Sequence, residues 1–387
     1  MKARASRGSG SDSGAAKNDA RRTTWARQIT GYPVTVAPDA LDRLPAVAAE
    51  TTSAHRFAIV TDETVRDLHA NRLAALFTKS DVAVLAVPPG ESHKSRESWG
   101  RLTDQLLALG YGRDSAVIAI GGGVVGDLAG FVAATFMRGI PFVQVPTTLL
   151  AMIDASIGGK TGVDTPHGKN LVGAFHRPAA VLADPKVLAT LPPRELRAGL
   201  AEAIKHGVIA DAAYLRQIGE SLPILLGFDG HASPHMTELI IRSIEIKGAI
   251  VEQDELEGGL RKILNFGHTI GHAVEALGNY QMLHGEAISI GMALEAEIGE
   301  RAGISARGTA DAVRRILEVA ELPAVRPLAL DPARIIEVAR GDKKNRAGSI
   351  ELALPLSVGK MASEETGWTA RIGEELIHEV LEECAER

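Results

Sequence analysis

A run of glycines directly after a strongly apolar segment constrains the fold of this chain more than any other feature. The sequence GGGVVG at 121–126 matches the pattern G-x-G-x-x-G. It follows the apolar run 115–120 and opens a small-residue stretch with helical spacing that continues to Ala134. In this setting glycines let the backbone approach a pyrophosphate, and the N-terminus of the following helix favours its negative charge. The alternative is a tight strand-to-helix turn that binds nothing.

Apolar strands and helical stretches alternate around this loop. Short β-rich runs at 56–61, 82–87, 115–120 and 142–145 are separated by helical periodicity, clearest at 98–109. Strands connected by helices of this length predict a parallel sheet in an α/β domain. From about Leu191 the pattern changes to long amphipathic stretches, which predict helices at 194–209, 236–252, 267–277, 286–302 and 309–320. The clearest strand-like run there is 350–354.

These patterns predict three parts. We expect residues 1–24 to form a disordered tail, 25–190 an α/β nucleotide-binding domain, and 191–387 a mainly helical domain, with the active site in the cleft between the two domains. The tail is rich in Arg, Lys, Ser, Gly and Ala. A transit peptide is the alternative interpretation, weakened by the glycines and by the lack of an amphipathic arginine stripe.

Charge and composition exclude some classes of function. The formal net charge is -6, so nothing electrostatic indicates nucleic-acid binding. No run of 18 or more apolar residues occurs, so no membrane span is expected. Cys384 is the one cysteine, which rules out an intramolecular disulfide and a cysteine metal site and suits a reducing compartment. We expect a cytoplasmic protein.

The glycine loop departs from an ordinary dinucleotide-binding unit. The next strand ends at Val145 and Pro146, without an acid to hold the adenosine ribose. Asp62 instead ends the first of these strands, and the loop 90–94 and the pair Thr147 and Thr148 follow other strand ends. All of them should gather at the carboxyl edge of the sheet, where nucleotides bind in open α/β folds.

Histidines in the helical half suggest a metal site. His268 and His272 are four positions apart and share one helix face, and His284 follows in a turn. Glu202 adds a carboxylate on a predicted helix. Three such donors suit catalytic zinc, and cobalt or manganese would also be tolerated. Spacing does not say which three residues bind the metal, and one histidine could be a core or helix-capping residue. Position 269 is not Glu, so this is not the H-E-x-x-H protease pattern.

Several lysines and arginines also lie in segments that lack the pattern of a solvent-exposed helix or strand face. Taken singly, each of these cations would be interpreted as a surface residue. Several, however, are flanked by glycines or lie beside the candidate metal ligands in the sequence. Together they could bind a substrate that carries both phosphate and carboxylate, and steer it despite the negative net charge. The set comprises Lys160, Lys169, Lys205, Lys247, Arg261, Lys343 and Lys344.

Taken together, these segments resemble the 3-dehydroquinate synthases of the sugar phosphate cyclase superfamily. The resemblance runs from about residue 28 to the C-terminus. Its first motifs are GGGVVGDLAGF at 121–131, RGIPFVQVPTTLL at 138–150, DASIGGKTG at 154–162 and GKNLVGAF at 168–175. It continues in LPPREL at 191–196, GLAE at 199–202, IK at 204–205, GLR at 259–261, LNFGHT at 264–269, GHA at 271–273, HGEA at 284–287 and DKK at 342–344.

The resemblance implies site assignments that spacing could not give. The metal ligands would be Glu202, His268 and His284, and the catalytic residues His272, Lys160, Lys205, Asp154 and Asn265. Substrate would be bound by Arg138, Lys160, Asn170, Lys247, Arg261, Asn265, His272 and Lys344 (or Lys343). The cofactor would be bound by Asp62, Glu91, Lys94, Gly122, Gly123, Val124, Asp127, Thr147, Thr148, Asp154 and Lys169. Lys247 and Arg261 would hold the substrate carboxylate, and Arg138 would reach a neighbouring subunit's site in a homodimer. Asp164 stands where Asn is more usual and adds negative charge near Lys169.

The implied activity is that of a carbon–oxygen lyase acting on phosphates. NAD and one Zn²⁺ or Co²⁺ per subunit would convert 3-deoxy-D-arabino-heptulosonate 7-phosphate, a phosphorylated sugar acid, to 3-dehydroquinate and phosphate, without net redox change. Alternatives are an amino-substituted synthase of antibiotic biosynthesis, a cyclase for sugars without a carboxylate, a polyol dehydrogenase of the glycerol dehydrogenase type, and an inactive binding module. A sugar lacking a carboxylate would not need Lys247 and Arg261, and a polyol dehydrogenase would not need the cation set.

Overall fold

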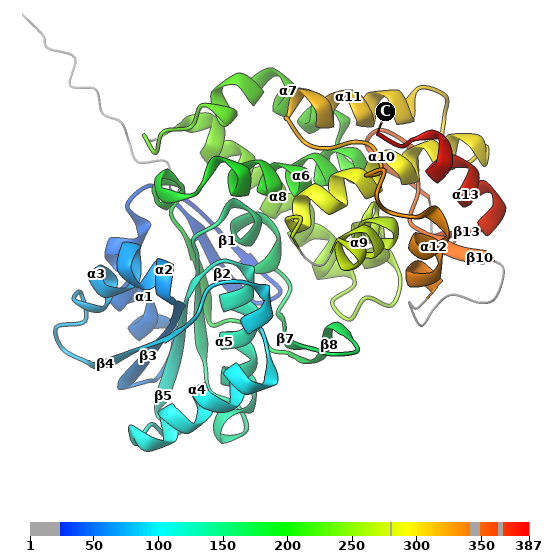
Figure 1. The fold of residues 1–387 in the computed structure, drawn as a ribbon. Helices are drawn as coiled ribbons and strands as arrows, with labels where there is room; N and C mark the ends of the chain where they lie inside the picture. The colour runs from blue at the N-terminus through cyan, green and yellow to red at the C-terminus, as the bar shows by residue number, and fades with distance from the viewer. Residues whose placement is uncertain (1–23, 232, 279–280, 341–348, 363–366, 387) are drawn as a thin grey trace, which may run out of the picture.

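The fold combines a parallel sheet flanked by helices with a second, mainly helical part (Figure 1). A computed structural model describes residues 24–386 apart from 232, 279–280, 341–348 and 363–366. Asp342, Lys343 and Lys344 therefore lie outside the described residues. None of the described helices is long and apolar enough to cross a membrane.

The first half of the chain builds a seven-stranded sheet in the order β1-β2-β9-β6-β5-β3-β4. β1 pairs antiparallel with β2, and the other neighbours are parallel. Its strands are β1 (Trp25–Ile29), β2 (Tyr32–Val36), β3 (Arg56–Asp62), β4 (Asp81–Val87), β5 (Ser115–Gly121), β6 (Phe142–Pro146) and β9 (Ala180–Ala183). The predicted parallel sheet is confirmed, and the hairpin β1–β2 is an addition to it.

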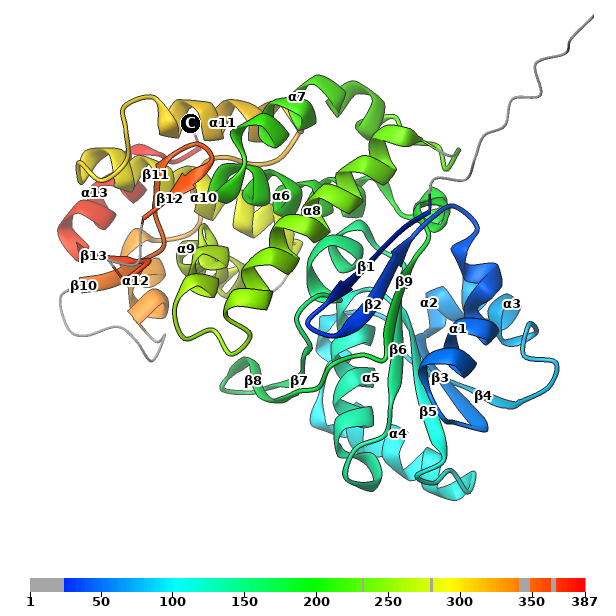
Figure 2. The same ribbon diagram turned by 180° about the vertical axis from the view of Figure 1, so that it is seen from behind.

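Helical segments connect these strands. They are η1 (Ala40–Arg43), α1 (Leu44–Thr51), α2 (Glu63–Val65), η2 (Arg66–Ala70), α3 (Asn71–Ala74), η3 (Glu91–His93), α4 (Arg96–Ala108), α5 (Gly123–Thr135), η4 (Phe136–Arg138), η5 (Ala151–Ala155) and η6 (Pro185–Thr190). A separate antiparallel ribbon, β7 (Lys160–Thr165) with β8 (Gly168–Phe175), projects below α9 in both views (Figures 1 and 2).

Both faces of the sheet are covered, because β5 is buried along its whole length. Ile118 and Ile120 join the larger apolar core, whereas Val117 and Ala119 join a smaller one with residues of α4 and α5. This two-residue alternation explains why the strand is apolar throughout: each face of the sheet needs apolar side chains.

The second half is mainly helical. It contains α6 (Pro193–Ala210), α7 (Ala212–Leu226), α8 (Pro234–Gln253), η7 (Leu260–Asn265), α9 (His268–Leu277), α10 (His284–Arg301), α11 (Thr309–Val319), α12 (Pro332–Arg340) and α13 (Glu374–Glu383). Short strands β10 (Ser349–Leu352), β11 (Pro355–Ser357), β12 (Lys360–Met361) and β13 (Ala370–Gly373) form two small sheets. The predicted fold class is confirmed. The division after residue 190 falls between η6 and α6, and we keep it as a proposal.

Candidate active site

The glycine loop lies at the carboxyl end of β5, where α5 begins. Gly126 lets this helix pack on the sheet, because a Cβ there would lie 2.9 Å from Oε1 of Gln144 on β6. Thr147, directly after β6, is buried, and its hydroxyl has no hydrogen-bond partner in the structure. An unpaired polar atom at this edge fits a ligand that supplies the missing bond. The edge therefore suits the expected nucleotide.

Other predicted nucleotide residues already have partners within the protein. Asp62 accepts the N–H of Val65 at 2.9 Å and so caps α2. The hydroxyl of Thr148 accepts the N–H of Ala151 at 3.1 Å. These contacts explain both residues as caps of short helices, and their contact with a cofactor stays a prediction.

A line of alternating charges runs along the same edge. Lys94 lies 2.7 Å from Asp127 and 3.8 Å from Glu91, and Lys169 lies 3.3 Å from Glu91. Burial disfavours the Lys94 ammonium, but Asp127 and Glu91 outweigh it and raise the pKa of Lys94. The structure therefore brings together four of the residues predicted to bind the cofactor.

Asp164 lies on β7, close to the turn of the β7–β8 ribbon. Its carboxylate accepts the N–H of Asn170 at 2.8 Å, where the backbone of Asn170 has a φ of 54°. This bond stabilises a left-handed conformation that asparagine tolerates better than most residues. The unusual acid at 164 is thus tied to the loop that presents Asn170.

Glu202 lies at the centre of the candidate metal site. It is fully buried on α6, and its Oε1 lies 3.6 Å from Nε2 of His268 and 3.5 Å from Nε2 of His284. Donors around a tetrahedral zinc with bonds of 2.0–2.1 Å are about 3.3 Å apart. Oε1 has no hydrogen-bond partner among the described residues, whereas Oε2 forms an ion pair with Lys205 on the same helix. These donors fit a divalent metal without rearrangement of the backbone.

Outer contacts orient the two histidines. His268 Nδ1 lies 3.1 Å from the carbonyl oxygen of Phe266, and His284 Nδ1 lies 3.5 Å from a carboxylate oxygen of Glu275. Each contact favours a proton on Nδ1 and leaves the lone pair of Nε2 facing Glu202, as in metal sites generally. Close helix packing brings the ligands together, because a Cβ on Gly285 would overlap the carbonyl of Ala198 on α6.

His272 is the histidine that spacing could not exclude. Donor atoms of His268, His272 and His284 lie within 4.8 Å of one another. However, contacts to Glu202 shorter than 4 Å join only His268 and His284 among these three described residues. His272 is also exposed to solvent. The geometry favours His272 as a neighbour of the metal rather than as one of its ligands.

A second cluster of possible ligands is filled by lysines. Asp154, Glu202 and His206 offer donors within 4.8 Å, but Lys247 lies 2.8 Å from Asp154 and Lys205 pairs with Glu202. Burial would raise the pKa of Asp154, yet Lys247 and Lys205 outweigh it and hold the pKa well below its usual range. The ammonium groups of Lys205 and Lys247 thus lie beside the carboxylates that a second metal ion would need as ligands.

Three predicted cations are buried close to this cluster. Lys205, Lys247 and Arg261 are exposed by 1%, 6% and 2%. Arg261 lies against Gly158, whose φ of 102° and missing side chain leave room for the guanidinium. Burial lowers the pKa of Lys247 to about 8. Buried cations of this kind are usual where an anionic ligand binds.

The predicted phosphate side is more open. Lys160 pairs with Glu257, and the side-chain amide of Asn265 donates to the other oxygen of Glu257 at 3.0 Å. Arg138 and Asn170 are exposed, and the structure of one chain does not test a role for Arg138 in a neighbouring subunit. Sequence patterns did not point to Glu257, because an acid in a glycine-rich turn has no distinguishing spacing.

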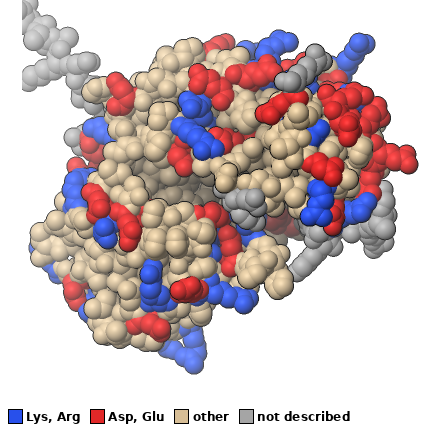
Figure 3. Space-filling view, viewed as in Figure 1, with Lys and Arg blue, Asp and Glu red and all other residues tan. Residues whose placement is uncertain are grey.

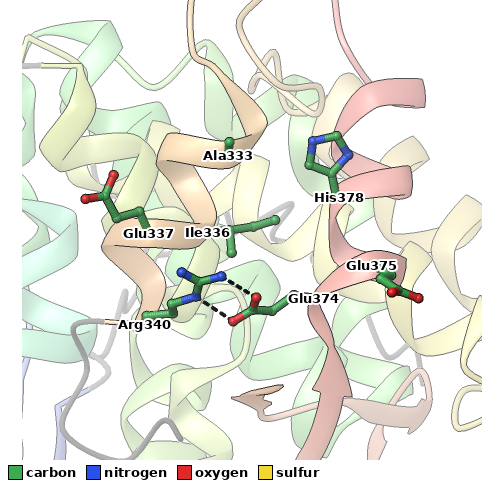
Figure 4. A pocket seen from close by; sticks show the side chains of 7 residues that line it. All are labelled: Ala333, Ile336, Glu337, Arg340, Glu374, Glu375 and His378. Carbon is green, nitrogen blue, oxygen red and sulfur yellow. Dashed lines mark hydrogen bonds and ion pairs between the residues drawn. The ribbon is translucent and has the colours of Figure 1, made fainter. Parts of the chain in front are cut away.

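Elsewhere the described surface carries mixed charges and a pocket away from the candidate site. Acidic and basic side chains are mixed on the face in Figure 3, which is hollowed near its centre. A pocket of about 570 Å³ between α12 and α13 is lined by Glu337, Glu374, Glu375, His378 and the pair Arg340–Glu374, and contains none of the predicted site residues (Figure 4).

Family models match two adjoining stretches of the chain. The 3-dehydroquinate synthase N-terminal model matches residues 84–198, and the C-terminal model matches 199–345. The chain belongs to the 3-dehydroquinate synthase family. The expectation drawn from the motifs is thereby confirmed.

Curated members of the family are similar over most of their length. The 3-dehydroquinate synthase of Pelobacter propionicus is 43% identical over 331 residues, 85% of this chain and 91% of its own. That of a Nostoc species is 44% identical over 333 residues, again 85% and 91%. The 3-dehydroquinate synthases are carbon–oxygen lyases, so the predicted enzyme class is confirmed.

Solved structures of related cyclases share the fold. A 2-deoxy-scyllo-inosose synthase complexed with carbaglucose-6-phosphate, NAD⁺ and Co²⁺ has a TM-score of 0.84 and 28% identity, covering 94% of this chain and all of its own. ValA, a 2-epi-5-epi-valiolone synthase from Streptomyces hygroscopicus with NAD⁺ and Zn²⁺ bound, gives 0.82 and 29%, covering 93% and 98%. A probable glycerol dehydrogenase from Sinorhizobium meliloti, at 18% identity and 0.63, shares the fold alone. The bound groups agree with the expected NAD and divalent metal.

Proposed function

We propose that this 3-dehydroquinate synthase converts 3-deoxy-D-arabino-heptulosonate 7-phosphate to 3-dehydroquinate and inorganic phosphate, with Glu202, His268 and His284 as the metal ligands. The observation that carries the proposal is the buried carboxylate of Glu202, with two imidazole Nε2 atoms within 3.6 Å and buried cations beside it. A site for metal thus adjoins a site for an anionic substrate. When bound, the metal supplies a Lewis acid and NAD a reversible hydride acceptor.

Two buried cations would bind the substrate carboxylate. Lys247 and Arg261 are nearly inaccessible to solvent, so an ion pair formed there loses little to screening. Both already contact protein oxygens, Lys247 at Asp154 and Arg261 at the carbonyls of Glu255 and Gly158. These contacts hold the two cations in place before the substrate arrives, which lowers the entropy cost of binding.

Lys160 and Asn265 would form the phosphate side, together with Asn170 and Lys344. In the structure both Lys160 and Asn265 contact Glu257. A substrate phosphate that binds there would replace the Glu257 carboxylate as the partner of Lys160, because phosphate carries more negative charge. His272, exposed and close to both metal-ligating histidines, would exchange a proton with the substrate hydroxyl through water.

The reaction has no net redox change, and this property decides between the alternatives. Purified protein with NAD and Zn²⁺ or Co²⁺ should release one phosphate and one 3-dehydroquinate per heptulosonate phosphate, with no accumulation of NADH. Absence of turnover by folded, metal-loaded protein would contradict the proposal. Turnover of an amino-substituted substrate alone would then indicate the antibiotic-pathway activity, and net NADH with a simple polyol would indicate a dehydrogenase.

We also propose a homodimer, in a cytoplasmic enzyme. Leu171 and Phe175 on the β7–β8 ribbon are each 52% exposed. The ribbon ends beside η4, because His176 contacts the carbonyl of Ile140 at 2.9 Å. Exposed apolar side chains near Arg138 support a contact through this surface. Light scattering should give twice the chain mass, and Phe175→Glu should give monomers; a wild-type monomer would contradict the dimer.

A further inference from the structure

Glu295 is a fully buried carboxylate on α10 to which the proposed reaction assigns no role. Its side chain is 0% exposed. One oxygen accepts the N–H of Gly267 at 2.7 Å, and the other accepts the N–H of Ile270 at 3.0 Å. Among the described residues, the groups that act on it are the backbone amides of Ile270, Gly267 and Thr269, with no Lys, Arg or His among them. A buried acid without a counter-charge is costly and needs an explanation.

Its partners are the free amides at the start of α9. The first N–H groups of a helix have no acceptor within the helix, and the residue before α9, Gly267, has no side chain to cap them. Glu295 supplies that cap from a different helix. Burial raises the pKa of Glu295 to about 8, while amides of Ile270, Gly267 and Thr269 act in the opposite direction.

The position of this cap connects it to the metal site. His268 is the first residue of α9, between two of the amides that Glu295 binds, and His284 is the first residue of α10, the helix that carries Glu295. Glu295 therefore joins the backbone that presents one proposed ligand to the helix that presents another. A small rotation at the start of α9 would move Nε2 of His268 away from Glu202.

We propose that Glu295 is a positioning residue for the divalent metal: it fixes the start of α9 so that His268 and His284 keep the spacing a metal requires. This inference rests on the ligand set given under the proposed function. It differs from a simple contribution to stability, because the loss should appear in metal affinity and in coordination geometry.

The same helix provides a matched control. Glu300, also on α10, accepts the N–H of Ala310 at 2.6 Å and so caps α11, which carries no proposed ligand. Glu295→Gln and Glu300→Gln thus each replace a carboxyl group on the same helix by an amide, and each leaves a helix start with a weaker cap. An amide at 295 would place its NH₂ against one of the two N–H donors, so one backbone amide would lose its acceptor.

The test is Co²⁺ and Zn²⁺ binding to the full chain, measured by chelator competition and by the visible spectrum of bound Co²⁺. We expect Glu295→Gln to weaken metal binding roughly 10- to 100-fold, as for other outer partners of metal ligands, and to alter the Co²⁺ spectrum. Glu300→Gln should bind within about twofold of wild type, by the same reasoning. Glu295→Asp, which keeps the carboxyl group but is one methylene shorter, should have an affinity between those two variants, and it replaces the Gln variant in the test if that variant does not fold.

Wild-type affinity and spectrum in both Glu295 variants would overturn the inference, as would an equal loss of affinity in Glu300→Gln. If His268→Ala binds metal as tightly as the wild-type chain, the ligand set is wrong, and this inference fails with it. The two failures are therefore distinguishable.

Discussion

Glu275 and His284 face each other with a carboxylate oxygen 3.5 Å from Nδ1 of the imidazole. The other oxygen of Glu275 lies 2.8 Å from the ammonium of Lys169, on the β7–β8 ribbon of the α/β domain. Burial would raise the pKa of Glu275, but the contacts with His284 and Lys169 outweigh it and lower the pKa to about 2. The carboxylate of Glu275 thus links Lys169, predicted to bind the cofactor, to His284, a proposed metal ligand.

Replacing this carboxylate should weaken metal binding. Glu275→Gln would leave His284 without a charged acceptor at Nδ1, and we expect the Kd for Zn²⁺ to rise about tenfold. Glu300→Gln is the control, because Glu300 lies on the same helix as His284 but caps α11, which carries no proposed ligand. Competition with a chromophoric chelator measures both, and equal affinities in wild type and Glu275→Gln would contradict the role.

Removing a proposed ligand should abolish activity through loss of the metal. His268→Ala should lower kcat by at least about a thousandfold, since a metal site contributes several kcal/mol of transition-state stabilisation. The same variant should retain less than one metal per chain by elemental analysis. His231→Ala should match wild type in both respects, because the His231 side chain is 92% exposed. Full activity after exhaustive chelation would show that no metal is needed.

The buried ammonium of Lys247 predicts a pH limit. Burial lowers its pKa from 10.5 to about 8, so the charged form is present below pH 8 and is lost as the pH rises through that value. If Lys247 binds the substrate carboxylate, kcat/KM should fall above about pH 8, approaching tenfold per pH unit. In Lys247→Arg the side chain stays charged over the whole pH range. The fall in kcat/KM should therefore begin at a higher pH, even if the activity of the variant is lower. An unchanged limb in that variant would assign the titration to another group.

Gly158 should be needed for the placement of Arg261. A side chain at 158 would overlap the guanidinium, and the φ of 102° adds strain for any other residue. Gly158→Ala should raise KM at least about tenfold by displacing a charged contact worth roughly 1.5–3 kcal/mol. Gly308→Ala shares the backbone strain, with a φ of 91°, but has open space around its Cβ. Both variants should melt at lower temperature, and a similar KM in both would exclude an effect through Arg261.

Sequence patterns predicted the fold well where periodicity was long. The apolar run of β5 and the helix α4 begin and end within about two residues of the predicted bounds. The hairpin β1–β2, the ribbon β7–β8 and the helices α12 and α13 were not predicted, because few residues carry the pattern in each. The longer helix α7 was also missed, and Pro223 lies inside it, where proline usually ends a helix. The roles of Asp62 and Thr148 as caps were also missed, since a strand-end acid or threonine has the same appearance whether it caps a helix or binds a ligand.

The site was predictable only in part, for a related reason. Spacing alone placed His268 and His272 on one face, yet Glu202, 66 positions earlier, contacts His268 and not His272. Only the family resemblance distinguished them. Glu275, Glu257 and Glu295 act on partners that tertiary packing brings close, and Glu295 binds backbone amides, which have no sequence signal at all.

Lys205 is three residues from Glu202 on the same helix, and this short separation has a consequence for synthesis of the chain. The histidines that complete the site emerge much later, His284 being 82 positions after Glu202. At roughly 5–20 residues per second, that interval lasts about 4–16 seconds. Lys205 can pair with the carboxylate as soon as α6 forms, so Glu202 has a counter-ion before the histidines are synthesised and keeps it in the completed fold.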